Sequence, residues 1–338
     1  MGSTISEIEL VKYTPEMKEI WDSFVMKDSN EGTIFHTITF LSYHGDKFKE
    51  NEYNLMFYKG KDRRNLIGVM PLGIFKEDGK TVVKTPYGAS FGGLVSKPFT
   101  PLRYYVQMVD KLLKLLSELN VDIIYVVPPP YIYSKIYSNY FEFVMFAKGF
   151  ELFDRRITSV VDLSTFREDP FEIIKKKERN SIRKAIKSGV EIKEDIKNID
   201  DIKAFYNILL QNKRYHNAKP THTLNEILTL KKLLPKNIKI DLAYYGGEPI
   251  AGIMYIICNS RVVLVFYICH YKDFSKLNAV SLLIYHGLKW AKKSGFRYVD
   301  FGRSANKYNY TTNTVLFFKE NFGSVGVFRD YYYLELNK

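Results

Sequence analysis

The amino-acid sequence predicts an α+β fold in which sheets and helices pack in layers. The clearest evidence lies in the second half, where residues 239–245, 250–258 and 262–270 are rich in β-branched and aromatic residues and are separated by short turns. Each segment is too short to span a bilayer, so we expect three adjacent antiparallel strands. Apolar residues then recur every three or four positions over residues 278–293, which predicts a helix, and residues 296–302 return as a strand.

The first half of the chain repeats this order of elements. The expected order is strands at residues 53–59, 66–75 and 81–84, a glycine-rich loop at 86–94, a helix at 102–119 and a strand at 121–127. The match suggests two copies of one fold, the first in residues 1–150 and the second in residues 151–324. The boundary is expected in residues 128–150, which are rich in aromatic residues and lack a clear periodicity.

Local signals place the remaining elements. Thr14 can cap a first helix over residues 14–26, because Pro15 suits the first helical position. Residues 33–44 are mixed and compatible with the start of a second helix. Further along we expect a strand at residues 158–163, helices at 169–189, 200–215 and 224–234, and a last aromatic strand at 326–336.

Composition limits the classes of partner and site. The chain has 338 residues, enough for about two domains. Its 50 Lys and Arg exceed its 37 Asp and Glu, and the formal net charge of +13 favours nucleic acid, nucleotide pyrophosphates or an anionic membrane surface. Cys258 and Cys269 lack metal-ligand spacing, so we expect buried free thiols in a reducing compartment. Because the sequence contains no recognisable signal peptide or membrane-spanning run, we expect a cytoplasmic protein.

The helix expected over residues 169–189 is dense in positive charge. The cations on one side of its helical wheel are Lys176, Arg179, Arg183 and Lys187. The apolar side is expected to hold Phe171, Ile174, Ile182, Ala185 and Ile186. Three further lysines lie beside the basic side, and only Glu172 and Glu178 oppose them. This pattern is compatible with a contact to a polyanion and with a solvated helix face, and the sequence does not decide between them.

The chain lacks the motifs of several common chemistries. Residues 88–92 match the nucleophile-elbow pattern, but Pro98 and Pro101 precede the next helix, so we expect a loop that lines a ligand or a plain turn. The six histidines show no metal-binding spacing, and His216 and His222 share a loop without an evident partner. We therefore expect no metal site, and no P-loop or Rossmann motif occurs.

Several segments together resemble Fem-type transferases. They are the basic run 177–185 with residues 188–190, and the segments 32–36, 247–252, 299–302 and 317–323. The resemblance covers nearly the whole chain, and the basic helix and the Phe-Lys pair in residues 317–323 are its most specific parts. The long coiled-coil arm of some members has no counterpart here, so the compact members are the closer comparison.

The resemblance implies two tandem acetyltransferase-like (GNAT) domains, each a mixed, mostly antiparallel sheet flanked by helices, with residues 325–338 completing the first domain. It implies transfer of an aminoacyl group from aminoacyl-tRNA to an amine of a peptidoglycan or other cell-envelope precursor, without a cofactor or metal. The expected partners are then aminoacyl-tRNA and a nucleotide-sugar or lipid-linked cell-wall precursor. A peripheral membrane contact is compatible with the positive charge.

The resemblance also implies roles for individual residues. Phe318 and Lys319 match the pair that lies at the reacting ester, and Asp300 is a further catalytic candidate. Lys219 and His44 fall near positions where the family binds acceptor phosphates with Lys or Arg, so the histidine departs from the pattern. The other candidates for binding substrate are Arg214, Tyr267 and Arg303.

The expected reaction is acyl transfer to an amine. Attack on an ester carbonyl builds an oxyanion, which a fixed positive charge in a water-poor site stabilises, and Lys319 is the candidate for that charge. The sequence also allows Lys319 to extend to water from its aromatic run. The general base stays open among Asp300, His44, Tyr267 and a group of the substrate.

Two alternatives stay open. The first is an acyl-CoA-dependent GNAT N-acyltransferase acting on an amino sugar or polysaccharide precursor. Such an enzyme holds the pyrophosphate at a glycine-rich turn entering the central helix, whereas residues 267–282 contain no glycine. The second is a non-catalytic RNA-binding module, which would use the basic helix and bind RNA with a steep dependence on salt.

Overall fold

The computed structural model describes residues 7–215 and 217–336, and the chain divides into two compact units. Unit 1 comprises Met1–Arg155 and Phe328–Lys338, and unit 2 comprises Arg156–Val327. Both boundaries run through strands, β8 (Glu151–Asp162) and β14 (Val325–Glu335), rather than through linkers. The domain limits drawn from the sequence, after residues 150 and 324, stay predictions.

A four-stranded antiparallel sheet in the order β1-β2-β3-β6 lies at the centre of unit 1. Its strands are β1 (Ile8–Lys12), β2 (Leu55–Lys59), β3 (Leu66–Met70) and β6 (Val95–Ser96). Alternate residues of β2 face opposite sides of the sheet. Leu55 and Phe57 pack with α3 (Leu102–Glu118) and α4 (Tyr140–Ala147). Met56 and Tyr58 pack on the other side with α1 (Lys18–Ser23).

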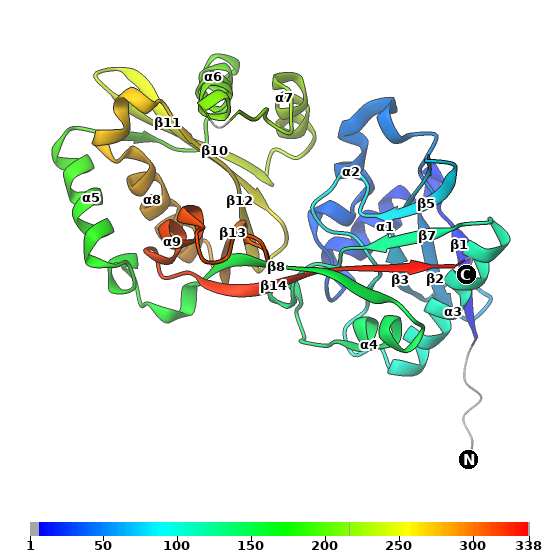
Figure 1. Cartoon of the computed structure of the whole chain (residues 1–338). Helices are drawn as coiled ribbons and strands as arrows, with labels where there is room; N and C mark the ends of the chain where they lie inside the picture. Colours follow the sequence, from blue (N-terminus) through cyan, green and yellow to red (C-terminus); the bar gives the residue numbers. More distant parts are fainter. Residues whose placement is uncertain (1–6, 216, 337–338) are drawn as a thin grey trace. The chain divides into compact units, whose positions relative to one another are not determined.

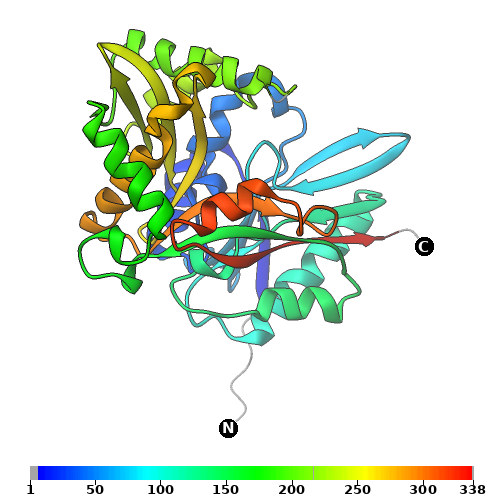
Figure 2. The same ribbon diagram turned by 60° about the vertical axis from the view of Figure 1, so that its left-hand side comes forward.

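Unit 1 contains a second group of strands. They are β4 (Gly73–Glu77), β5 (Lys80–Thr85), β7 (Ile123–Val126) and the end of β14. β4 and β5 form an antiparallel hairpin, which extends to the right in Figure 2. β5 runs parallel to β7, and β14 pairs antiparallel with β7 through Tyr332–Glu335. The last strand of the chain therefore pairs with a strand from its first half.

Two expectations for the start of unit 1 need correction. The helix expected over residues 14–26 is interrupted: a 3-10 turn (Pro15–Met17) leads into α1, and a π turn (Phe24–Asp28) follows it. The side chain of Thr14 makes no capping hydrogen bond. Residues 33–44 contain α2 (Ile38–Leu41) between two 3-10 segments, Ile34–His36 and Ser42–Phe48.

Two further segments of unit 1 differ from the predictions. Residues 66–75 form β3 and β4 rather than one strand, because Pro71 between them has no N–H for a strand ladder. Residues 128–150, which show no clear periodicity in the sequence, contain α4. Its helical period is hidden in the sequence because the outward side of α4 is as apolar as its buried side.

Unit 2 is a mixed sheet in the order β8-β13-β12-β11-β10-β9, covered by helices on both faces. Figure 1 shows β10, β11 and β12 with α5 and α8 on one side and α6 and α7 on the other. The strands are β9 (Glu191–Lys193), β10 (Ile238–Tyr245), β11 (Glu248–Ile257), β12 (Val262–His270) and β13 (Tyr298–Ala305). The helices are α5 (Lys176–Lys187), α6 (Ile199–Tyr215), α7 (Leu224–Leu233), α8 (Ala279–Lys293) and α9 (Thr314–Glu320).

The predicted core of unit 2 is confirmed. β10, β11 and β12 form an antiparallel meander, and α8 connects β12 to the parallel strand β13. α8 and α5 bury their apolar sides on one face of this sheet. Both cysteines are buried free thiols, as expected. None of the helices in the described part of the chain combines the length and apolar character that crossing a bilayer requires.

The basic helix is shorter than predicted and its sides differ from the helical wheel. Asp169 accepts a hydrogen bond from the Phe171 amide and starts a 3-10 turn (Pro170–Glu172), and α5 itself begins at Lys176. Ile186, expected on the apolar side, is exposed, whereas Glu178 is buried. Glu178 is four residues from both Ile174 and Ile182, so it lies on the buried side of the helix.

Removing one ring from α6 should destabilise unit 2. Phe205 is fully buried, and its Cδ2 lies only 2.6 Å from where a Cβ on Gly252 of β11 would be. Phe205→Ala leaves a cavity against this bare strand and should lower the free energy of unfolding by about 3–5 kcal/mol. Ile199→Ala removes a 57% exposed side chain from the same helix and should change it by less than about 0.5 kcal/mol. Urea unfolding followed by circular dichroism checks both, and equal effects would contradict this packing.

Candidate functional site

Strands β12 and β13 of unit 2 run side by side for only part of their length. They pair in parallel at Val262, Val263 and Leu264, opposite Tyr298, Val299 and Asp300, and their pairing ends there. A bulge in β13 follows between Asp300 and Arg303, where Gly302 has a φ of +73°. A side chain at that φ would be strained, so glycine permits the bend. The sheet therefore opens between the two strands beyond Leu264.

The buried carboxylate of Asp300 stabilises this bulge. It accepts hydrogen bonds from the Gly302 amide, at 2.7 Å, and from the hydroxyl of Thr158 on β8. Asp300 is fully buried and is absent from the lining of the pocket described below. In this structure the predicted catalytic carboxylate thus shapes the backbone of β13.

Lys319 of α9 binds the backbone of β13 just beyond the bulge. Its Nζ donates to the carbonyl oxygens of Gly302 (3.1 Å) and Arg303 (3.3 Å) and to Ser304 Oγ (2.9 Å). An ammonium has three N–H donors, so these contacts match its full capacity. Burial lowers the pKa of Lys319 to about 8, and the negative charge of Asp300 opposes that shift. Lys319 is therefore buried rather than extended to water.

A pocket of about 380 Å³ lies beside Lys319. Its walls come from the end of α6, β11, the end of β12, the start of α8 and α9. The lining residues used below are Asn212, His270, Asn278, Ser281, Phe318 and Lys319. The structure therefore brings the predicted pair Phe318-Lys319 to one cavity. The first turn of α8 also lines it, and the amides of a helix N-terminus favour negative charge.

Glu178 is a residue of this region that the sequence analysis missed. Its Oε2 accepts a hydrogen bond from Ser281 Oγ at 2.9 Å, and its Oε1 accepts one from Asn321 Nδ2 at 3.4 Å. The backbone amide of Lys175 donates to Asn321 O at 2.8 Å. Glu178 thus connects the basic helix to the start of α8 and the end of α9, behind the pocket wall. A single acid on the apolar side of a basic helix was the available signal.

The predicted substrate-binding residues of unit 2 do not gather at the pocket. Tyr267 precedes Ile268, which lines the pocket, and adjacent strand residues face opposite sides. Its hydroxyl accepts a hydrogen bond from the His222 amide at 3.1 Å, and burial raises its pKa. The cationic candidates Lys219, Arg214 and Arg303 are exposed. The other histidine of that loop, His216, lies outside the described residues.

His44 belongs to unit 1. Its Nε2 lies 2.7 Å from the carbonyl oxygen of Gly88, and its ring packs against Tyr43 and Phe48 with centroid distances of 3.9 and 4.7 Å. These contacts hold the glycine-rich loop of residues 86–94. The structure gives His44 a part in fixing this loop, and its predicted contact with substrate stays a prediction.

The predicted polyanion-binding residues form an exposed side of α5. Lys176, Arg183 and Lys187 are exposed, and Arg179 is half-buried, with Nη1 donating to Phe171 O at 3.3 Å. The guanidinium of Arg183 lies over the Phe171 ring, 5.2 Å from its centroid. The aromatic ring therefore holds part of the basic side in place, and the cations remain accessible to a ligand.

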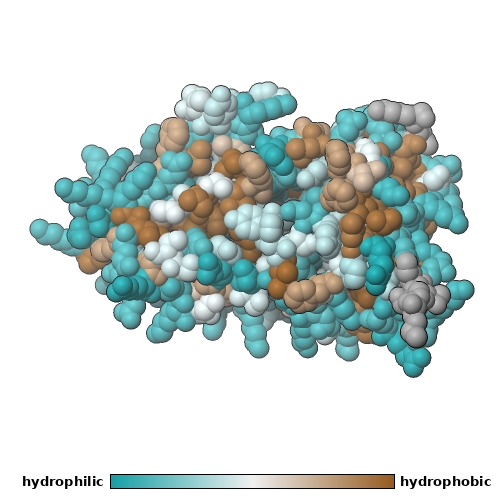
Figure 3. Space-filling model, turned by 90° about the horizontal axis from the view of Figure 1, so that it is seen from below, coloured by the Kyte–Doolittle hydropathy of each residue, from teal (hydrophilic) through white to brown (hydrophobic). Residues whose placement is uncertain are grey.

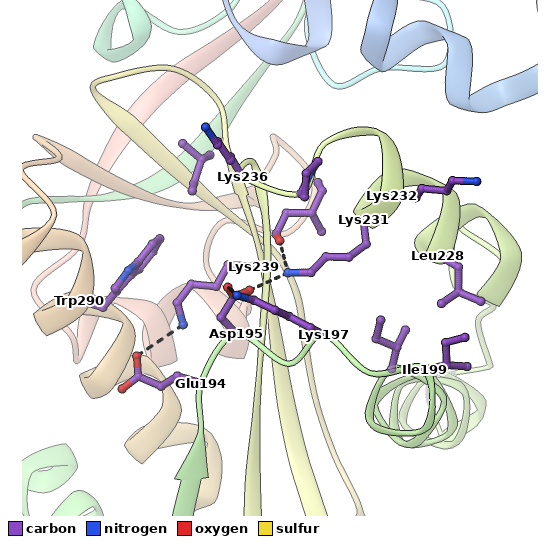
Figure 4. A pocket seen from close by; sticks show the side chains of 14 residues that line it. Glu194, Asp195, Lys197, Ile199, Leu228, Lys231, Lys232, Lys236, Lys239 and Trp290 are labelled. Carbon is purple, nitrogen blue, oxygen red and sulfur yellow. Dashed lines mark hydrogen bonds and ion pairs between the residues drawn. The ribbon is translucent and has the colours of Figure 1, made fainter.

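A larger cavity, of about 950 Å³, lies beside β10 in the same unit. Figure 4 shows Lys231 and Lys239 directed toward acidic groups: Lys231 Nζ donates to Asp195 Oδ1 (2.6 Å) and to Ile238 O (2.7 Å). Lys239 pairs with Asp241 and lies 3.7 Å from Glu194. These buried cations neutralise carboxylates, and Lys231 also binds a backbone carbonyl at the start of β10. We therefore place the candidate transfer site at the smaller pocket beside Lys319.

Comparisons with known proteins agree with this fold. Residues 175–310 match the acetyltransferase (GNAT) domain family. The structure of FemX is similar over 97% of this chain and 98% of its own, with 13% sequence identity and a TM-score of 0.71. A tandem GNAT protein from the clavulanic acid biosynthesis pathway is similar over 98% of this chain and 99% of its own, with 10% identity and a TM-score of 0.57.

A third similar structure is the C-terminal domain of a putative lysylphosphatidylglycerol synthetase from Agrobacterium fabrum. It covers 94% of this chain and 91% of its own, with 10% identity and a TM-score of 0.61. A comparison with curated protein sequences finds no significant match. The expected fold, tandem GNAT-like domains as in Fem-type proteins, is confirmed, and the domain match identifies an enzyme of the acyltransferase class.

The environment of Lys319 predicts a pH-dependent stability. Its pKa is about 8 in the folded protein and 10.5 ordinarily, so the unfolded chain binds more protons between these pH values. The free energy of unfolding of the wild type should therefore rise, relative to that of Lys319→Met, by about 2 kcal/mol between pH 8 and pH 10. Urea unfolding of both proteins across this range measures the difference. A difference that stays constant would mean that the ammonium is not desolvated.

Proposed function

We propose, from a GNAT acyltransferase domain in residues 175–310 and a fold shared with FemX, that this enzyme transfers an aminoacyl group from aminoacyl-tRNA. The acceptor in this proposal is an amine of a peptidoglycan or other cell-envelope precursor, either nucleotide-linked or lipid-linked. The observation that carries it is the pocket beside Lys319, because Phe318 and Lys319 line it together with the first turn of α8. No cofactor or metal is part of the reaction.

The proposed step is aminolysis of an ester. The amine nitrogen attacks the ester carbonyl carbon, a C–N bond forms, the C–O bond to the ribose breaks, and the ribose oxygen takes up a proton. The positive charge of Lys319 favours the oxyanion that forms between these events, and its buried position strengthens that effect. Since Asp300 already accepts hydrogen bonds from Gly302 and Thr158, we favour a group of the substrate as the base.

The other candidate residues enter the proposal as binding groups. The exposed cations Lys219, Arg214 and Arg303 would contact acceptor phosphates, and the basic side of α5 would contact the tRNA backbone. His44 would contribute by fixing the glycine-rich loop of residues 86–94, and Tyr267 by fixing the loop that contains His222. A lipid-linked acceptor is supported by the similar structure of a putative lysylphosphatidylglycerol synthetase. The product in that protein's name is built on phosphatidylglycerol, an anionic phospholipid.

An acyl-CoA-dependent N-acyltransferase is the second candidate. The domain match itself and the α8 N-terminus at the pocket favour it, since a pyrophosphate can bind at a helix N-terminus. Asn278, with a φ of 56°, takes the conformation that a glycine would otherwise provide at this turn. Calorimetric titration with acetyl-CoA separates the two candidates. The non-catalytic RNA-binding alternative lacks such support, because the match is to an enzyme domain.

Replacing the buried cation should slow the chemical step. Lys319→Met should lower the single-turnover rate of acyl transfer about a hundredfold, because loss of one group that stabilises an oxyanion costs about 3 kcal/mol. Lys319→Arg keeps the charge and should retain more activity than the methionine variant. Rates are compared with labelled aminoacyl-tRNA after circular dichroism has shown that both variants are folded. Equal rates for the wild type and Lys319→Met would remove the residue from the mechanism.

The basic helix should set the affinity for tRNA. Replacing Lys176 and Lys187 with alanine removes two exposed charges, so the plot of log K against log salt should become less steep by about 0.7–0.9 for each phosphate that is no longer neutralised. A matched control replaces Lys61 and Lys80, two exposed lysines of unit 1, with alanine. Filter binding of tRNA at several salt concentrations gives the slopes. Identical slopes for both double variants would exclude a specific contact at α5.

A further inference from the structure

Helix α4 of unit 1 presents an apolar surface to solvent. It buries one side in the core beside α3 and turns Tyr140, Phe143 and Phe146 outward. Phe143 is 56% and Phe146 74% exposed. Residues spaced by three share one side of a helix, so these rings form a row along α4. Nothing in the fold of unit 1, as far as the described residues show it, requires aromatic residues at positions with this exposure.

The surface continues beyond the helix. Tyr131, Tyr137 and Phe328 line a pocket of about 370 Å³ together with Phe143, so these rings surround one pocket, which also contains Glu142 and the ion pair Arg155–Asp330. We call the aromatic face the set Tyr131, Ile136, Tyr137, Tyr140, Phe143, Phe146 and Phe328, all of them exposed. Figure 3 views the molecule from the side on which α4 lies in Figure 1, and hydrophobic side chains reach the surface there. Contiguous apolar surface of this kind marks an interaction site.

The loop before α4 is held firmly by Asn30. Its Nδ2 donates to Ile136 O at 2.8 Å, and its Oδ1 accepts from the Ile136 amide at 2.7 Å. The Lys135 amide donates to Asn30 O at 3.0 Å, and the rings of Tyr131 and Tyr137 meet edge to face with 5.4 Å between centroids. The exposed rings are therefore presented by a fixed backbone. The one charged residue of α4, Glu142, lines the pocket.

Lysines lie at both ends of the aromatic face. Lys135 Nζ donates to the backbone carbonyl of Lys27 at 2.6 Å, which places two lysines together before α4. Lys148 is the C-cap residue of the helix, and its Nζ forms an ion pair with Asp110. A row of Phe and Tyr rings with lysines at its ends fits a membrane surface, where rings enter the headgroup region and cations meet lipid phosphates. The net charge of +13 has the sign that an anionic surface attracts.

We propose that the aromatic face docks this protein on an anionic phospholipid bilayer. Phe143 and Phe146 enter the boundary between headgroups and acyl chains, and Lys135 lies at the level of the phosphates. Docking stands apart from the proposed aminoacyl transfer, because it needs neither donor nor acceptor. Taken together with that function, it selects the lipid-linked precursor over the soluble nucleotide-sugar.

Vesicle binding tests the aromatic face directly. The full chain should float with vesicles of phosphatidylcholine containing about a third phosphatidylglycerol, and more weakly with phosphatidylcholine alone. The double variant Phe143→Ser/Phe146→Ser should lower the partition coefficient at least about tenfold, because two rings lose their apolar environment. Lys135→Glu should weaken binding to the anionic vesicles only. Flotation in a density gradient measures the binding of the wild type and of both variants to each kind of vesicle.

Ile20→Ser is the matched control. Ile20 is 55% exposed on α1, which packs on the opposite face of the β1-β2-β3-β6 sheet from α4, and its loss should leave vesicle binding unchanged. Thermal unfolding confirms that each variant is folded. Absence of wild-type flotation, or equal flotation of the double variant, overturns the proposal. A wild-type dimer in sedimentation velocity that the double variant loses, without vesicle binding, would instead make this face an interface between copies.

Discussion

The parting of β12 and β13 is the constraint on which the rest of unit 2 depends. Two strands that separate inside a protein leave backbone carbonyls without hydrogen-bond partners in the sheet. Buried carbonyls of this kind need other hydrogen-bond partners. Lys319 supplies them for Gly302 and Arg303, while Asp300 binds the Gly302 amide on the same bulge. Opposite charges therefore hold the two sides of one distortion. Lys319, which binds this bulge, also lines the pocket together with the start of α8 and the end of β12.

The structural contacts of Lys319 compete with its proposed role at the oxyanion. All three of its N–H groups are directed to protein acceptors, so a reacting oxygen either takes the place of Ser304 Oγ or feels the charge without a direct bond. The lowered pKa, about 8, adds a second limit, because the charged form becomes the minority as the pH rises above that value. A lysine that first stabilises the fold and then serves a reaction must therefore be judged by rate and stability together. Glu178 should be judged in the same way, because its carboxylate accepts a hydrogen bond from Ser281, a residue that lines the pocket.

The periodicity of apolar residues predicted most of the fold. It failed where exposed side chains are apolar or buried side chains are charged. The meander β10–β12 and helix α8 were found because their apolar residues alternate or recur at fixed spacing. α4 was missed because rings on both of its sides erase that spacing. Phe318-Lys319 was identified by resemblance, whereas the carbonyls that Lys319 binds depend on a bulge that leaves no mark in the sequence except Gly302. Glu178 was noted only as an acid opposing the basic side, although its spacing from Ile174 and Ile182 places it on the buried side.

The two units expose different kinds of side chain: cations on α5 of unit 2 and aromatic rings on α4 of unit 1. α5 in unit 2 presents cations held over Phe171, which suits the repeating phosphates of a nucleic acid. α4 in unit 1 presents rings held by Asn30 and a buried helix side, which suits an apolar boundary. A soluble donor needs a charged surface that releases it readily, and an acceptor anchored in lipid needs the enzyme to stay at the membrane. The proposed function therefore divides the two substrates between the units, with the tRNA donor at α5 and the lipid-linked acceptor near α4.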